Sequence, residues 1–315
     1  MKFVRFTDAS GAPRAGVVDG DVYRVIAGAT DLLPLIEQGE DALRSAGDTA
    51  LAGGEAVAAD TVTTLSPIAT PPTFRDFYAF EQHVKAGRKW RGLEMDPLWY
   101  EIPVFYFSNP YAFRGEGEVR MTPGAANFDF ELEVAAVLGK GGRDLTPDEG
   151  EDCVIGYAVL NDWSGRDVQQ KEMLLSMGPV KGKDTSTSMG PYLVTKDELE
   201  PYRTPTGFDR AMTLTVNGVE YSRANWSDVY YSFGEMVAYA SRGTEVRPGD
   251  VIGSGTCGTG CILELSRTYS SEQYPWLKDG DEVVATVEGL GSLRSRIVAG
   301  PETPAWRADI TRPGA

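Results

Sequence analysis

The sequence predicts a mainly β, mixed α+β fold, in which a β-roll or β-sandwich follows a small α+β domain. Three observations lead to this prediction. Strand-like apolar runs dominate the chain after residue 66. Tight Asp-Gly and Asn-Gly turns join neighbouring runs as hairpins. Helical stretches are short and do not alternate regularly with strands, which argues against a doubly wound parallel sheet.

Residues 1–66 are expected to form the small domain. FVRF is a short strand, and AGVVDGDVYRV is expected to be a hairpin that turns at Asp19–Gly20. DLLPLIEQGEDALRSAG is expected to be one short helical stretch that ends at Gly47. A run of prolines then begins at Pro67, and we place the boundary with the catalytic domain, residues 67–315, there.

Strands and a few helices are expected in the larger domain. The strand-like segments read FDFELEVAAVL, VIGYAVLND, the hairpin AMTLTV-NG-VEYSR, VIGSG, CILELS and the pair EVVATVEGLGSLRSRIV. The turn of the first hairpin is Asn217–Gly218. Helices are expected at about 79–91, 164–175 and 228–242.

The composition limits the partners of this protein. It has 315 residues, with 30 Lys and Arg against 46 Asp and Glu, so its net charge is −16. A field of this sign repels phosphate backbones, and we expect no nucleic-acid partner. No apolar run reaches the roughly 18–20 residues that span a membrane, and the first residues lack the apolar core of a signal peptide. Three cysteines are too few for a disulfide framework, and the odd count favours a reducing compartment, so we expect a cytoplasmic protein without a membrane partner.

One predicted strand carries three acidic residues at alternate positions. Asp129, Glu131 and Glu133 would share one face, because successive side chains of a strand point to opposite sides. Neighbouring carboxylates on that face would lie about 7 Å apart and repel by about 2 kcal/mol at an effective dielectric constant of about 20. The face is therefore either a solvated acidic edge or a site for a cation. Oxygen ligands favour Mg²⁺, Mn²⁺ or Ca²⁺ over Zn²⁺.

A fourth carboxylate lies where a strand meets a helix. Asp162 ends VIGYAVLND, directly before the expected helix. Ser164 and Asp167 have the spacing of a capping box, which supports a helix start at this point. Asp162 is therefore either a ligand at the strand–helix junction or only the cap of the helix.

His83 is the single histidine of the chain. An imidazole beside a cationic patch and near an orienting carboxylate would be a plausible general base. The alternative is an ordinary amphipathic helix with a solvated basic face. The basic residues that follow His83 are Lys85, Arg88, Lys89 and Arg91.

The segment Gly253–Gly258 has the spacing G-x-G-x-x-G. Because CILELS after it has a strand pattern where a dinucleotide fold requires a helix, we do not interpret it as a nucleotide site. A glycine-rich loop allows the backbone to approach a ligand closely. Cys257 and Cys261 have no third thiolate or histidine near them in the sequence, and we interpret them as inert.

These segments together resemble the fumarylacetoacetate hydrolase (FAH) superfamily over roughly residues 65–300. The motifs that carry the resemblance occur in the family's order and read DFYAFEQH, IPVFY, FELE, NDWSGRDVQ, GPVKGK and GSGT…GCILELS. The resemblance implies the FAH-type β-roll or β-sandwich.

The resemblance also implies roles for individual residues. The implied metal ligands are Asp76, Glu131, Glu133 and Asp162, with Mg²⁺, Mn²⁺ or Ca²⁺ as the ion. The implied catalytic residues are His83 and Glu264, which would activate water, and Lys183, Gln169 and Arg166, which would orient substrate and stabilise charge. The implied substrate contacts are Tyr78, Tyr106 and Thr256, with Arg88 and Arg91 as candidates to hold a carboxylate. Asp129 matches no ligand of the family and is expected to support one.

The implied activity is hydrolysis of a C–C bond in a small 1,3-dicarbonyl acid, such as an acylpyruvate or a fumarylacetoacetate-like compound. A homodimer is also implied. The nearest alternative is decarboxylation or isomerisation of a 2-oxo or unsaturated dicarboxylic acid on the same scaffold, and the more distant one is a non-catalytic ligand-binding β domain. Because His83 and Glu264 are both present, we favour hydrolysis.

Overall fold

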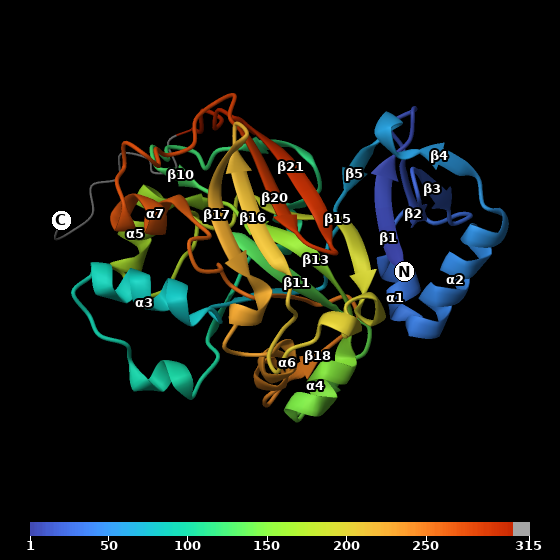
Figure 1. Ribbon diagram of the computed structural model, residues 1–315, viewed down its shortest axis with the longest axis horizontal. Helices are drawn as coiled ribbons and strands as arrows, with labels where there is room; N and C mark the ends of the chain where they lie inside the picture. The colour runs from blue at the N-terminus through green and yellow to red at the C-terminus, as the bar shows by residue number, and fades with distance from the viewer. Residues whose placement is uncertain (305–315) are drawn as a thin grey trace.

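The computed structural model describes residues 1–304, in which two packed β-sheets are flanked by short helices (Figure 1). The expected mainly β, mixed α+β class is confirmed. Within these residues no helix is both long and apolar enough to cross a membrane. The last eleven residues of the expected catalytic domain, 305–315, lie outside the described part of the chain, and the domain boundary at 66/67 stays a prediction.

The larger sheet has twelve strands. Ten of them follow the order β4-β3-β2-β1-β15-β13-β11-β19-β6-β7, while β5 pairs with β1 and β8 pairs with β15. The strands are β1 (Lys2–Thr7), β2 (Pro13–Asp19), β3 (Val22–Val25), β4 (Ala56–Ala58), β5 (Thr63–Leu65), β6 (Phe74–Phe77), β7 (Phe105–Phe107), β8 (Phe113–Arg114), β11 (Leu132–Leu138), β13 (Val154–Asp162), β15 (Thr187–Thr195) and β19 (Val251–Gly253).

The second sheet has five strands and packs through β20 and β21 on β13 and β15 of the larger one. Its order is β17-β16-β20-β21-β9, and two short pairs, β10-β14 and β12-β18, lie outside both sheets. The strands are β9 (Gly117–Arg120), β16 (Ala211–Val216), β17 (Val219–Asn225), β20 (Glu282–Val287), β21 (Gly291–Val298), β10 (Phe128–Asp129), β14 (Ser164–Gly165), β12 (Gly142–Arg143) and β18 (Glu245–Val246).

Most of the α-helices are short, and α1 and α2 pack on one face of the larger sheet (Figure 1). Two expectations about helices are wrong. The helix expected to end at Gly47 is two helices, separated near Gly39, whose φ of 103° is unfavourable for a side chain. CILELS is helical rather than extended. The helices are α1 (Leu33–Glu37), α2 (Glu40–Gly53), α3 (Glu81–Trp90), α4 (Pro147–Cys153), α5 (Arg166–Met173), α6 (Phe233–Ala240) and α7 (Ile262–Thr268).

The central strand β11 is buried on both faces. Leu132 and Val134 belong to the core between the two sheets, which includes Leu214 of β16. Ala135 and Val137 point to the other face of the larger sheet, where they join a second core with the helices of the N-terminal part. This part of the chain, on the right in Figure 1, is joined to the rest by the antiparallel pairing of β1 with β15.

Candidate metal centre and active site

Four carboxylates from β6, β11 and β13 of the larger sheet, or from directly beside these strands, meet at one point, with β19 lying between β11 and β6. Asp76 lies on β6, Glu131 directly precedes β11, Glu133 lies on β11, and Asp162 ends β13. Each offers an oxygen atom within 4.8 Å of the others, and all four residues are buried. The structure thus brings together the four acidic residues expected to be metal ligands, which are far apart in the sequence.

A glycine makes room for this cluster. Gly253 of β19 lies beside Asp76 of β6, and a β-carbon added to Gly253 would lie 2.3 Å from Asp76 Oδ1. A carboxylate and a side chain cannot share that space. The absence of a side chain at position 253 therefore allows the Asp76 carboxylate to lie between β6 and β11.

The acidic strand is interrupted but keeps its two faces. The expected continuous strand is divided into β10 and β11 at Phe130–Glu131. Phe130 is in the core between the sheets, as expected, while Asp129, Glu131 and Glu133 are directed away from it. The alternative of a solvated acidic edge is wrong, since Asp129 and Glu133 are 0% exposed and Glu131 is 5% exposed.

The four carboxylates are buried, but the cations and hydrogen-bond donors around them do not fully offset the cost of ionising them there. Burial, followed by the neighbouring carboxylates, raises the pKa of Asp76 and Glu133 well above the usual range, and burial likewise raises the pKa of Asp162. One oxygen of each of these three carboxylates is buried without a hydrogen-bond partner: Asp76 Oδ1, Glu133 Oε1 and Asp162 Oδ1. Buried charges of this kind are normally paired or bound to metal, so this donor set fits a hard divalent cation.

Lys183 is a cation that contacts the cluster directly. Its Nζ donates to Asp162 Oδ2 at 2.7 Å and also to Glu131, and the hydroxyl of Tyr106 donates to Asp162. Burial alone would raise the pKa of Glu131, but Lys183 and then Arg166 outweigh it and lower this pKa to about 2. Glu131 is therefore the most firmly ionised of the four acidic residues.

Arg166 connects the cluster to two helices. Its Nε donates to Asp129 and its Nη2 to Glu131, both at 2.7 Å, while its Nη1 donates to Gln169 Oε1 at 3.1 Å. Asp129 also accepts the first backbone N–H groups of α7, from Ile262 at 2.7 Å and from Leu263 at 3.0 Å. Asp129 thus supports the site without belonging to the four-carboxylate cluster.

The expected capping box before α5 is not formed. The residue before the helix is Gly165, and the Ser164 hydroxyl donates to the carbonyl of Asp162 instead. Asp167 accepts from the backbone of Ala126 and Asn127. The alternative interpretation of Asp162 as the helix cap is therefore wrong, although the helix starts near the expected position.

The single histidine pairs with a glutamate beside the cluster. His83 Nδ1 lies 2.7 Å from Glu264 Oε2, and Glu264 Oε1 accepts the backbone N–H of Thr259 at 2.9 Å. The pair joins α3 to α7, which pack together on the left in Figure 1. Ligand atoms of His83, Glu131 and Cys261 lie within 4.8 Å of one another, so the imidazole is adjacent to the carboxylate cluster.

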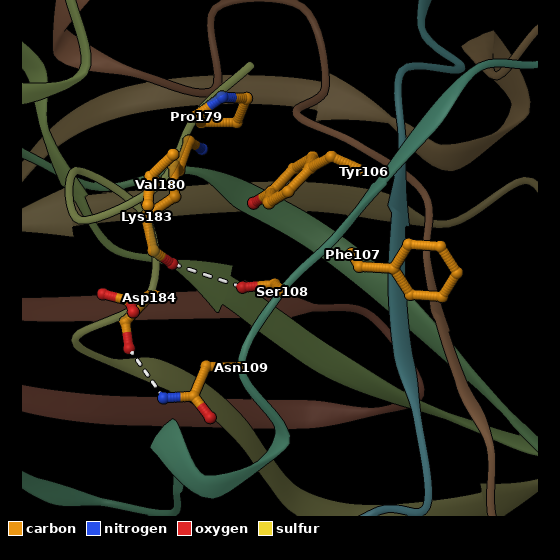
Figure 2. A pocket seen from close by; sticks show the side chains of 8 residues that line it. All are labelled: Tyr106, Phe107, Ser108, Asn109, Pro179, Val180, Lys183 and Asp184. Atoms are coloured by element: carbon orange, nitrogen blue, oxygen red, sulfur yellow. Dashed lines mark hydrogen bonds between the residues drawn. The ribbon is translucent and has the colours of Figure 1, made fainter. Parts of the chain in front are cut away.

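A pocket of about 230 Å³ opens beside the cluster. Tyr106 and Lys183, both of which bond to Asp162, form part of its wall. Figure 2 shows how two hydrogen bonds tie the opposite walls together: Ser108 Oγ donates to the carbonyl of Lys183 at 3.3 Å, and Asn109 Nδ2 to that of Asp184 at 3.2 Å. A small acid in this pocket would meet Tyr106 and Lys183 close to the carboxylates.

The remaining expected substrate contacts differ in their surroundings. Thr256 is buried in the glycine-rich loop, and Tyr78 stacks edge-on against His83 with ring centroids 5.7 Å apart. Burial raises the pKa of Tyr78 to about 12. Arg88 Nε donates to the carbonyl of Glu94 at 2.6 Å and Arg91 Nε to that of Gly87 at 3.1 Å, so both guanidinium groups are engaged within α3 and the segment that follows it.

Three residues of the site were not expected from the sequence. Gly253 leaves space for Asp76, and Asn161 Oδ1 accepts the backbone N–H of Glu131 at 2.9 Å. Cys261, which the sequence analysis interpreted as inert, lies beside His83 and Glu131. The N-D-W-S motif could have indicated Asn161, because Asn161 directly precedes Asp162 in it. No pattern in the sequence indicated the position of Cys261.

The fold and the site define a β-sandwich protein with a buried carboxylate cluster beside a histidine–glutamate pair. Comparison with protein-family models identifies it further: the chain belongs to the fumarylacetoacetate hydrolase family. The model described as fumarylacetoacetate (FAA) hydrolase C-terminal matches residues 72–298. A second model, described as Rv2993c-like, N-terminal, matches residues 1–67.

Curated relatives and solved structures agree with this assignment. Fumarylacetoacetase of Arabidopsis thaliana is 26% identical over 72% of this chain and 69% of its own length, and the fumarylacetoacetase of Oryza sativa is 28% identical over 70% and 65%. An oxaloacetate tautomerase of Bacillus subtilis is 29% identical over 62% of each chain. The matches thus span about two thirds of these relatives.

Two solved structures show the same fold. Fumarylacetoacetate hydrolase of Exiguobacterium antarcticum is 25% identical, covers 95% of this chain and 99% of its own, and has a TM-score of 0.76. Maleylpyruvate hydrolase of Sphingobium sp. SYK-6, solved with manganese(II) and pyruvate, is 24% identical, covers 96% and 100%, and has a TM-score of 0.72.

Replacing one carboxyl of the cluster by an amide should stabilise the protein when metal is removed with a chelator. Raised carboxyl pKa values mean that the native state holds protons that the unfolded chain has lost, so stability falls as the pH rises above about 4. Glu133→Gln keeps an acceptor for the backbone N–H of Gly255 and should raise Tm by roughly 2–6 °C at pH 7. Thermal unfolding in EDTA from pH 5 to pH 8 measures this. The matched variant of an exposed residue, Glu272→Gln, should leave Tm unchanged, and an equal shift in both variants would contradict the account.

Proposed function

We propose that this protein is a divalent-metal-dependent hydrolase that cleaves a C–C bond in a small 1,3-diketo acid of the acylpyruvate type. The observation that carries the proposal is the position of Glu131, which belongs to the carboxylate cluster, accepts hydrogen bonds from Lys183 and Arg166, and also lies beside His83. Glu131 is therefore part of the candidate cation site and also lies next to the candidate base, His83.

The cation would be held by Asp76, Glu131, Glu133 and Asp162. Their oxygen-only donor set favours Mg²⁺, Mn²⁺ or Ca²⁺, and the three partnerless oxygens support this assignment. When bound, the ion supplies Lewis-acid polarisation of substrate oxygens and offsets negative charge. The maleylpyruvate hydrolase solved with manganese(II) and pyruvate supports a divalent ion, and pyruvate is the product that hydrolysis of an acylpyruvate would leave.

His83 would act as the general base. Because Nδ1 is held by Glu264, Nε2 is the nitrogen free to take a proton from water. The water oxygen then bonds to the acyl carbon, the adjacent C–C bond breaks, and its electron pair passes to the departing methylene carbon. His83 can return its proton to that carbon, which balances the hydrolysis.

Lys183 and Gln169 would stabilise the charge that develops on the substrate oxygens. Lys183 lines the pocket, and the contacts of its ammonium group with Glu131 and Asp162 fix the position of that group. Gln169 accepts from Arg166 through Oε1, so its NH₂ group remains as a donor. Donors held in advance at a developing oxyanion usually contribute a large part of catalysis. Tyr78, Tyr106 and Thr256 would contact the substrate, and Arg88 or Arg91 would have to turn toward the pocket to bind its carboxylate.

Isomerisation or decarboxylation on the same scaffold is the second candidate. The oxaloacetate tautomerase among the relatives favours it, because tautomerisation needs proton transfer but no attacking water. The hydrogen-bonded pair of His83 and Glu264 favours hydrolysis. A homodimer and a cytoplasmic location remain predictions from the resemblance and the composition.

The substrate class is tested by incubating the protein and Mn²⁺ with fumarylpyruvate, another acylpyruvate or oxaloacetate and identifying the products by NMR. The proposal expects pyruvate and the matching carboxylic acid in equal amounts from the acylpyruvates. Enol–keto exchange or CO₂ release from oxaloacetate, without cleavage of any acylpyruvate, would instead support the second candidate. No turnover of any of the three would support the ligand-binding alternative.

Gly253→Ala should weaken Mn²⁺ binding by at least about tenfold, because its β-carbon would displace the Asp76 carboxylate. Isothermal titration calorimetry measures this affinity. The matched control is Gly53→Ala in α2, where the added carbon meets nothing within 4 Å. Wild-type affinity in Gly253→Ala would remove Asp76 from the metal site.

His83→Ala should lower kcat by about 10²–10⁴-fold while one equivalent of Mn²⁺ is still bound, since the imidazole is assigned to the water and not to the ion. Steady-state kinetics and metal analysis of the same preparation test both parts. If hydrolysis remained close to that of the wild type, the dyad would have no role in water activation.

A further inference from the structure

Beside the carboxylate cluster lies a second group of ligand atoms with a different chemistry. His83, Glu131 and Cys261 each offer one ligand atom, and these atoms lie within 4.8 Å of one another. Together they supply a nitrogen, an oxygen and a sulfur. The mechanism proposed above uses the histidine and the glutamate but gives Cys261 no task.

The spacing is close to that of a tetrahedral metal site. Zn²⁺ binds sulfur at about 2.3 Å and imidazole nitrogen or carboxylate oxygen at about 2.0–2.2 Å, so its ligand atoms lie roughly 3.3–3.7 Å apart. From the upper limit of 4.8 Å, shifts of up to about 0.8 Å per ligand atom would bring the three atoms to that separation. A mixed nitrogen, oxygen and sulfur set is softer than the neighbouring oxygen-only set and favours Zn²⁺ over Mg²⁺.

The histidine is already oriented as a metal ligand would be. Metal-binding histidines usually donate their other ring nitrogen to a carboxylate, which fixes the ring and its tautomer. His83 meets this condition, because Nδ1 contacts Glu264 at 2.7 Å and Glu264 is itself held by the backbone N–H of Thr259. Cys261 is equally fixed, as it immediately precedes α7 and its Sγ accepts the backbone N–H of Glu264 at 3.4 Å.

We propose that His83, Cys261 and Glu131 form a second metal site that binds Zn²⁺ or a similarly soft divalent cation and thereby inhibits the enzyme. Binding releases the thiol proton of Cys261 to solvent and forms a metal–thiolate bond. The same ion occupies Nε2 of His83, so the imidazole can no longer accept a proton from water. The inhibition, though not the binding, rests on the proposed function.

The binding is tested by titrating the Mn²⁺-loaded protein with Co²⁺, because cobalt bound to a thiolate has a charge-transfer absorption that oxygen ligands do not produce. The proposal expects this band to saturate at one equivalent in the wild type and to be lost in Cys261→Ala and in Cys261→Ser. Cys153→Ala is the matched control, since Cys153 lies in α4 away from the site, and it should keep the band. Thermal unfolding checks that each variant is folded.

The inhibition is tested by measuring turnover of an acylpyruvate at rising Zn²⁺ with Mn²⁺ held constant. The Zn²⁺ concentration for half-inhibition should rise at least about 100-fold in Cys261→Ala and stay at the wild-type value in Cys153→Ala. A protein that shows the cobalt band but no turnover would contradict the proposed function and leave the second site standing. Absence of the band in the wild type, or its survival in both Cys261 variants, would overturn the second site.

Discussion

The burial of four carboxylates at one point is the constraint on which the rest of this structure depends. In a low-dielectric interior such a cluster is costly unless each charge is paired, protonated or bound to a cation. The surrounding residues meet part of this cost: Lys183 contacts Glu131 and Asp162, and Gly255 donates its backbone N–H to Glu133. The oxygens left without hydrogen-bond partners belong to Asp76, Glu133 and Asp162. A divalent cation would offset the cost of burying these oxygens.

Glu131 connects this cluster to the chemistry that we assign to His83. Its two oxygens accept from Arg166 and Lys183, and its backbone N–H is held by Asn161. Through Arg166 and Asp129 the same network reaches the first turn of α7, the helix that carries Glu264. Two of the proposed metal ligands, Glu131 and Asp162, are therefore hydrogen-bonded to Lys183 in the pocket wall, and Glu131 is linked through Arg166 and Asp129 to the helix that carries Glu264.

The roles of the site residues were implied by the family resemblance and remain predictions. Local patterns predicted most of the strands correctly, because alternation and turn chemistry act over a few residues. The faces of the Asp129–Glu133 segment and the Asn217–Gly218 hairpin are of this kind. Local patterns could not predict contacts between segments that are far apart in the sequence. CILELS has a strand pattern, yet it forms α7, whose first N–H groups are accepted by Asp129 more than 130 residues earlier. The position of Cys261 beside His83 depends on the same distant packing.

The most direct test is a crystal structure of the Mn²⁺-loaded protein, with the ion located by its anomalous scattering. We predict a single strong peak within about 2.0–2.4 Å of oxygens from at least three of Asp76, Glu131, Glu133 and Asp162. A manganese ion bound elsewhere, or held by fewer than three of these residues, would contradict this prediction.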